Sequence, residues 1–379
     1  MIRLGLPADA EKALIETLAK DHLVSCTVQL LSFDHEPLGR IVGRVTAGQI
    51  NYDAKTQVSR QAQITVVDPR GEIEVDYDDG QPRLNRMIRV HYNVWVDSPV
   101  WDWVKIPVFT GPITKTSRSD DGTVQIEASG KQALSTGPCE QPRSFAKGLN
   151  RVNVIRVILS ELAGETRFKL PKGWPARTGK RISMGRQSSA WTYADSVARS
   201  MKAQLYYDGW GNVRLRKVPV RPSFTFRDGD GGMVISPPTV GESSEAMVNR
   251  AVVTGAIPKG KKKPLVGRAT LPAWHRYSPQ SMARGGRNKF YFERIEDDSL
   301  RTQKEVDDAA QRIIDRVQVA ESEVTFDALP MPLLEEGDII VVDTKGARVT
   351  APLTQMSLPL GHDGVSTIGY LAPVSKRRR

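Results

Sequence analysis

Histidine is the first residue type to consider for chemistry, because imidazole binds zinc and exchanges protons near neutral pH. No two of the five histidines stand four residues apart, as two zinc ligands on one helix would, and neither His-Glu-x-x-His nor Cys-x-x-Cys occurs. The histidines are His22, His35, His91, His275 and His362. We therefore predict no metal site, no cofactor and no metal-dependent catalysis.

Carboxylates gather at residues 76–80 and 296–298. The first group, Asp-Tyr-Asp-Asp-Gly, could be a calcium loop or a glycosidase pair, but it lacks EF-hand spacing and its Asp-Gly step is typical of a hairpin tip. The second group precedes Thr302 and supplies negative charge before a helix start, which the helix dipole favours. No Gly-x-Ser-x-Gly elbow and no phosphate-binding Gly-Lys-Ser/Thr loop is present. We predict no catalytic residues and a protein that is not an enzyme.

Aromatic side chains cluster at Trp95, Trp101 and Trp103, around Pro99. Trp101 and Trp103 share one face of the expected strand. Such a pair packs in a core or a subunit interface, or forms a platform for stacking a sugar, and we favour packing.

The bulk composition restricts the class of protein. Lys and Arg exceed Asp and Glu by 54 to 43, a net charge of +11, with basic runs at 259–263 and 376–379. We interpret both runs as solvated loop and tail, with a nucleic-acid-binding module as the alternative. Cys26 and Cys139 are too few for a disulfide framework, so we expect reduced thiols and folding in a reducing cytoplasm. No apolar run reaches the length of about 20 residues that a membrane helix needs, so we expect no membrane insertion.

Period-two strands dominate the first part of the chain. After a short helix over 8–20, apolar and polar residues alternate in several runs, most clearly over 88–96. Turn signals such as Asp-Gly separate these runs. The pattern predicts an N-terminal antiparallel β-barrel over residues 1–140.

A small α/β module is expected over residues 145–220. One helix carries Val152, Ile155 and Leu159 and stops at Gly164; a second starts at Ser188 or Ser189. A hairpin with a Gly-rich turn follows at 204–216.

The remaining residues predict a second barrel with an insertion. Strand patterns at 221–256 and 320–372 would form the barrel, around an insertion at 257–319 and before a basic tail at 373–379. The insertion contains a long basic loop, for which we expect order only on assembly, and a helix with a Thr302-x-x-Glu305 capping box. The predicted fold class is β-rich α+β: two small antiparallel β-barrels flanking the α/β module, plus the inserted basic loop and helix.

The succession of short motifs resembles the central hub proteins of phage tail tips, including minor tail proteins of siphophages. The specificity lies in the order of the motifs, which spans nearly the whole chain. These motifs are Gly48–Ala54, Val58–Arg60, Ile64–Pro69, Phe109–Ile113, Val124–Ala128, Ala194–Ala198, Gln204–Gly209, Val248–Gly255, Ser278–Pro279, Ala309–Ala310 and Glu335–Asp338.

The resemblance implies a structural virion protein at the tail tip, or baseplate hub, assembled in the host cytoplasm. It implies a homotrimer whose two barrels per subunit continue the tail tube and adapt sixfold to threefold symmetry. The implied partners are the distal tail protein, the tape measure protein and tip or fibre proteins, with DNA transit through the lumen and no specific DNA binding. No lysin or fibre segment follows residue 372, so no wall-cutting role is expected. The alternatives are a tail-associated peptidoglycan-degrading enzyme and a basic nucleic-acid-binding module.

Overall fold

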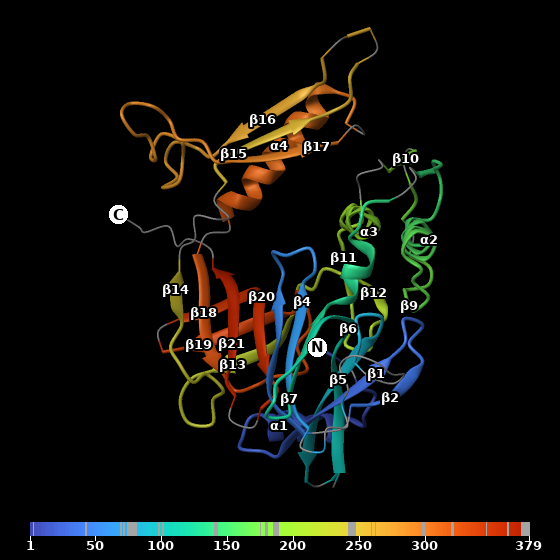
Figure 1. The fold of residues 1–379 in the computed structure, drawn as a ribbon. Coiled ribbons are helices and arrows are strands. Elements are labelled where there is room, and N and C mark those ends of the chain that lie inside the picture. The colour runs from blue at the N-terminus through green and yellow to red at the C-terminus, as the bar shows by residue number, and fades with distance from the viewer. Residues whose placement is uncertain are drawn as a thin grey trace. The chain divides into compact units, whose positions relative to one another are not determined.

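The computed structural model is shown in Figure 1, coloured from the N-terminus to the C-terminus. It describes residues 1–2, 4–41, 44–68, 70, 73, 82–97, 99–100, 102–139, 143–174, 176–178, 181–184, 189–241, 248–258, 260–261, 263–297, 300–319, 322–345, 347–361 and 364–372. The chain forms two compact units. The larger holds Met1–Pro238 and Phe326–Tyr370, and the smaller holds Thr239–Thr325 with the residues after Tyr370.

The larger unit combines many strands with short helices. Its helices are α1 (Ala8–Leu18), η1 (Lys131–Ser135), α2 (Arg151–Ala163) and α3 (Ala190–Arg199). Its early strands are β1 (Val24–Leu31), β2 (Pro37–Arg40), β3 (Arg44–Asp53), β4 (Arg60–Val67), β5 (Met87–Val96), β6 (Asp102–Arg118) and β7 (Thr123–Ser129). Next come β8 (Ser144–Phe145), β9 (Phe168–Lys169), β10 (Ile182–Ser183), β11 (Ala203–Tyr207), β12 (Val213–Lys217) and β13 (Pro222–Arg227). The late strands are β19 (Ile339–Thr344), β20 (Ala347–Pro359) and β21 (Ser366–Ala372), while β18 (Ser322–Ala328) runs from the smaller unit into the larger.

Two long strands organise the large sheet. β6 pairs with β5 along its first part and with β7 along its last part. β20 pairs with β19 at its start, and with β21 and β3 further on. The order of strands across the sheet is β18-β21-β20-β3-β4-β7-β6-β5-β1-β2. One face follows the predicted alternation, with Ile88, Val90 and Val94 fully buried in β5.

The α/β module packs a hairpin on two helices. Asn150 caps α2 by accepting the N–H of Val152, and Gly164 ends it at φ +65°. Ser189 caps α3, at one of the two positions predicted. β11 and β12 form the predicted hairpin. Its inner face joins the apolar core of α2 and α3, through residues such as Leu205.

The smaller unit packs a three-stranded sheet on one helix, as Figure 1 shows. Its elements are β14 (Thr239–Gly241), β15 (Arg250–Thr254), β16 (Val266–Thr270), β17 (Phe292–Glu296) and α4 (Gln303–Val319). The predicted capping box is confirmed, since Thr302 Oγ1 accepts the N–H of Glu305 (3.2 Å) and a Glu305 carboxylate oxygen accepts the N–H of Thr302 (3.0 Å). Ala251 and Val253 of β15 form the core with Val306, Ala310 and Ile314 of α4.

Asn249 fastens the long basic segment to this sheet. Its side chain is 0% exposed. The amide donates to the carbonyl oxygens of Tyr277 (3.1 Å) and Lys289 (2.9 Å), and its oxygen accepts the N–H of Tyr291 (2.8 Å). One side chain of the motif at 248–255 therefore holds the middle of the segment, at the residue before Ser278–Pro279, and its end.

The prediction of a β-rich α+β fold is confirmed, but the described strands form no closed barrel. β3 pairs with β4 on one edge and with β20 on the other, so the edge that could close an N-terminal barrel is already used. In addition, β13 pairs with β19 in parallel, whereas we expected antiparallel barrels. Thr239–Thr325 of the smaller unit separate these two strands in the chain, and a long connection is what a parallel pair requires.

Two assignments around the insertion also differ from the structure. The strand at 248–255, expected in the second barrel, is β15 and pairs with β16 and β17. β16 itself lies within the stretch expected to be a loop. The apolar side chains of Ala251 and Val253 explain the difference. They are buried against the apolar face of α4, and this burial favours β15 in the sheet of the smaller unit.

We predict that Asn249→Ala weakens the smaller unit by about 3 kcal/mol, because two buried carbonyl groups lose their donor. Amide exchange within residues 277–291 should become faster, and urea unfolding should show the loss. Asn288→Ala is the matched control, since Asn288 is exposed in the same segment and should change neither measurement. Equal behaviour of the two variants would show that Asn249 does not hold the segment.

Candidate functional site

Several buried charges of the larger unit gather at the turn Glu335–Asp338, which we call the carboxylate turn. Glu335, Glu336 and Asp338 are 7%, 6% and 1% exposed. Gly337 has φ +69°, a conformation that favours glycine, and a Cβ there would lie 2.7 Å from the amide end of the Gln204 side chain. Asp338 stabilises the turn by accepting the N–H of Glu335 at 2.9 Å. Three carboxylates are thus buried within four residues.

Arg60 of β4 supplies the first positive charge. Its Nε donates to Glu336 Oε1 at 3.1 Å, and Ser59 Oγ donates to the same oxygen at 2.6 Å. A second donor of the guanidinium reaches the carbonyl oxygen of Val108 at 3.1 Å. Arg60 is in phase with the core residues Ala62, Ile64 and Val66, which is the reason it points inward.

The outer face of the β11–β12 hairpin supplies further donors. Arg216 Nη1 lies 3.0 Å from Asp338 Oδ1 and 3.9 Å from Glu335 Oε2. Gln204, the cross-strand neighbour of Arg216, donates to the carbonyl oxygen of Glu336 at 2.8 Å. The carboxylate turn therefore holds β4 and the hairpin together.

Burial and positive charge compete at this site. Burial raises the pKa of the Glu335 carboxyl, and Arg60 and Arg216 oppose the rise. Burial also disfavours the Arg60 charge, but Glu336 and Glu335 outweigh it and raise the pKa of Arg60. The Arg60 guanidinium stays charged. Removing either Arg60 or Glu336 would therefore leave the other as a buried charge without a counter-charge.

A second network holds the tip of the same hairpin, residues Asp208–Gly211. Three consecutive carbonyl groups of this tip each accept a side-chain donor. The bonds are Thr110 Oγ1 to Gly209 O (2.7 Å), Arg89 Nη2 to Trp210 O (3.2 Å) and Lys131 Nζ to Gly211 O (3.1 Å). A Cβ on Gly209 would lie 1.8 Å from the carbonyl oxygen of Pro107, so the tip approaches the sheet at backbone contact.

Lys131 is the centre of this second network. Its ammonium has three acceptors, namely Gly211 O, Glu165 Oε2 (2.7 Å) and His35 Nε2 (2.7 Å), which match its three N–H donors. Burial lowers the pKa of Lys131, and Glu165 opposes that. Burial, followed by the charge of Lys131, lowers the pKa of His35 to about 3, so this imidazole is neutral and accepts from the lysine.

Of the histidines considered for chemistry, His35 belongs to the second network and His91 contacts the hairpin tip. The motifs that carry the resemblance contribute more, because Arg60, Thr110 and Gln204 and the carboxylate turn itself all lie within the two networks. Residues 76–80 lie outside the described residues, as do Trp101 and Asp298. Trp95 and Trp103 face each other across β5 and β6 and pack edge to face, with ring centroids 5.8 Å apart. His91 and Trp210 of the hairpin tip pack in a T-shaped arrangement, with ring centroids 5.7 Å apart.

Cys26 and Cys139 are both free thiols in the structure. Burial raises the pKa of the Cys26 thiol to about 12. Within the described part of the chain, no group of His, Cys, Asp and Glu side chains is arranged to hold a metal ion. None of the described helices is long and apolar enough to cross a membrane.

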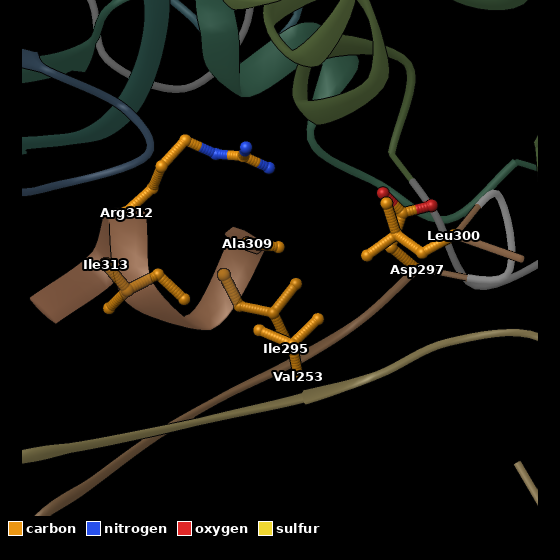
Figure 2. Close-up of a pocket in the computed structure, with 7 residues that line it drawn as sticks. All are labelled: Val253, Ile295, Asp297, Leu300, Ala309, Arg312 and Ile313. Atoms are coloured by element: carbon orange, nitrogen blue, oxygen red, sulfur yellow. The ribbon is translucent and has the colours of Figure 1, made fainter. Parts of the chain in front are cut away.

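The smaller unit contains a cavity of about 280 Å³. Figure 2 shows the residues that line it. Ala309, Arg312 and Ile313 come from α4, Val253 and Ile295 from β15 and β17, and Asp297 and Leu300 from the connection to α4. Because its walls are mainly apolar, the cavity is a packing gap beside the helix and lacks the convergent polar groups of a specific ligand site.

Comparison with solved structures reveals a likeness in fold to tail proteins. A tail protein from Neisseria meningitidis MC58 is similar with a TM-score of 0.60 at 10% identity, over 92% of this chain and 96% of that one. The 43 kDa tail protein of prophage MuSo2 from Shewanella oneidensis has a TM-score of 0.59 at 13% identity, over 92% and 98%. Prophage tail protein gp18 from Listeria monocytogenes EGD-e has a TM-score of 0.51 at 8% identity, over 93% and 95%.

This chain has the fold of phage tail proteins. No protein-family model and no curated protein sequence matches it significantly. At 8–13% identity these similarities concern the fold, and at that level they confirm the resemblance to tail proteins drawn from the motifs.

We predict that Arg60→Met destabilises the larger unit by about 3–5 kcal/mol, because buried Glu336 loses its counter-charge. Adding Glu336→Gln should recover part of the loss, giving a coupling of about 1–3 kcal/mol in urea unfolding. A control double-mutant cycle uses the surface pair Lys115 and Glu127, whose side chains are 67% and 42% exposed. Their coupling should stay below about 1 kcal/mol. Similar couplings in the two cycles would contradict the account of a buried junction.

We further predict a pH effect from His35. Its folded pKa of about 3 lies below the ordinary histidine pKa of 6.5, so between these two pH values a proton binds His35 in the unfolded state alone. Stability should therefore fall as the pH drops below 6.5, by up to about 1.4 kcal/mol per pH unit. His35→Asn tolerates the positive φ of 67° and removes the titration, so its unfolding free energy should fall less steeply. Parallel curves for the two proteins would show that His35 titrates normally.

Proposed function

We propose that this chain is a structural, non-enzymatic component of a phage tail and forms the central hub of the tail tip. The observation that carries the proposal is the likeness in fold to tail proteins over 92% of this chain and nearly the full length of those proteins. In this proposal the protein belongs to the virion, at the tail tip, after assembly in the host cytoplasm.

The hub is proposed to be a homotrimer. Each subunit contributes two sets of strands, one around β5 and β6 and one around β19 and β20. In this proposal the two sets take equivalent places in the ring, so that three subunits present six sheet regions. Such a ring would continue the tail tube and adapt sixfold to threefold symmetry. Its proposed partners are the distal tail protein, the tape measure protein and tip or fibre proteins, and DNA would pass the lumen without specific binding.

The two buried networks support a structural role. A hub carries load between other proteins, and its modules must keep a fixed orientation. The β11–β12 hairpin is held on its outer face by the carboxylate turn and at its tip by Thr110, Arg89 and Lys131. The carboxylates of the carboxylate turn are buried and already accept hydrogen bonds from side chains of the same protein. This arrangement suits holding the hairpin in place better than it suits acid–base catalysis.

We predict that the purified protein, alone or with its distal tail partner, has three times the 42.0 kDa mass of one chain by native mass spectrometry. Immunogold labelling of purified tails should mark the tip. A protein that stays monomeric in both samples and is absent from tails would contradict the hub.

The two alternatives have distinct readouts. A peptidoglycan-degrading enzyme would clear a suspension of cell walls, which a hub would not. A nucleic-acid-binding module would bind duplex DNA with an affinity that falls steeply with salt, because each neutralised phosphate releases counterions.

A further inference from the structure

The three-stranded sheet of the smaller unit has one face that its own helix does not cover. The strand order is β16-β15-β17, and α4 packs on the face that carries Ala251 and Val253. Because side chains alternate along a strand, Arg250, Val252 and Thr254 lie on the opposite face.

The strand register identifies the neighbours on that opposite face. Val252 lies opposite Arg268 of β16 and Arg294 of β17, so an apolar side chain stands between two arginines. One row away, Arg250 lies opposite Phe292. We call this set, Arg250, Val252, Arg268, Phe292 and Arg294, the arginine face. Arg268 and Arg294 are exposed, and Phe292 is 49% exposed.

Aromatic rings position two of the three guanidinium groups. Arg294 lies over the ring of Phe292, 5.7 Å from its centroid, and Arg250 lies over Phe290 at 4.5 Å. Stacking on a ring reduces the rotamer freedom of arginine and leaves the edge of its fork available for a carboxylate. Less entropy is then lost when a partner binds.

The charge of the chain is concentrated in the segment that builds this face. Residues 256–296 contain ten Lys and Arg residues and two Glu residues, a net charge of +8 within the total of +11. A partner of negative charge is therefore favoured, and its approach is accelerated by the field.

The mixture of residues selects the kind of partner. Phosphate-tracking surfaces rely on Lys and Arg and on polar groups, whereas Arg together with aromatic side chains is enriched in protein interfaces. Val252 and Phe292 offer apolar area that a phosphate backbone cannot use. Two strand spacings separate Arg268 from Arg294, about 10 Å, which leaves room for an apolar side chain between two carboxylates.

We propose that the arginine face docks an acidic protein segment in which apolar residues alternate with carboxylates. The carboxylates pair with Arg268 and Arg294, and the apolar side chains contact Val252 and Phe292. This interaction does not depend on the trimer, because the face is complete within one smaller unit.

The test uses the full-length protein and a fluorescein-labelled ten-residue peptide of alternating Glu and Leu. Anisotropy titrations near physiological salt should show saturable binding. Replacing Leu by Ser, or Glu by Gln, should weaken binding about tenfold or more, since either change removes one half of the recognition. Absence of binding at about 1 mM peptide, or equal binding of the Ser peptide, would overturn the proposal.

Charge-reversal variants locate the site. R268E/R294E should lose binding about tenfold or more, and the milder R268Q/R294Q should lose part of it with no new negative charge. The matched control is K304E/R312E, which changes the net charge equally but alters exposed residues of α4. Equal loss in the control would assign the binding to overall charge. Tighter binding of a 20-base-pair DNA duplex, abolished by R268E/R294E, would assign the face to nucleic acid and overturn the proposal.

Discussion

Three carboxylates in four consecutive residues can leave water only if other parts of the chain bring donors to them. This constraint organises the larger unit. Glu336 accepts hydrogen bonds from Ser59, just before β4, and from Arg60 at its start. Asp338 accepts one from Arg216 of the hairpin. Because these donors are more than a hundred residues distant in sequence, the turn forms correctly only when the sheet and the hairpin are both in place. Buried pairs of this kind add little net stability, yet breaking one is costly, so they favour one arrangement over others.

The hairpin shows how the constraint fixes orientation. Its inner face is apolar and packs on α2 and α3, and its outer face carries Gln204 and Arg216 to the carboxylate turn. The tip is held separately through its backbone carbonyl groups by Thr110, Arg89 and Lys131. Contacts on a face and at an end leave a rigid body little freedom to rotate, and this agrees with the proposed role in an assembly that transmits force.

Local signals predicted the local structure well. The capping box at Thr302, the helix stop at Gly164 and the hairpin at 204–216 all depend on residues close in sequence, so they could be recognised directly. Pairings between distant segments could not be recognised from the sequence. The parallel pair of β13 and β19 spans the smaller unit, and no local pattern states which edge a strand will use.

The buried networks were missed for a related reason. The alternation of apolar and polar residues placed Arg89 and His91 on the second face of β5. The hairpin tip covers that face, and it lies more than a hundred residues further along the chain. Arg60 did carry a signal, since it is in phase with Ala62, Ile64 and Val66 and so points to the core. A charge in phase with apolar residues indicates a buried partner, although its identity as Glu336 needs the structure.

Native-state hydrogen exchange on Arg216→Met would test most directly whether the carboxylate turn holds the hairpin. The account predicts that amides of β11 and β12 lose protection by a factor of about ten or more, while those of β5 and β6 keep theirs. Unchanged protection in the hairpin, or an equal loss throughout the larger unit, would contradict it.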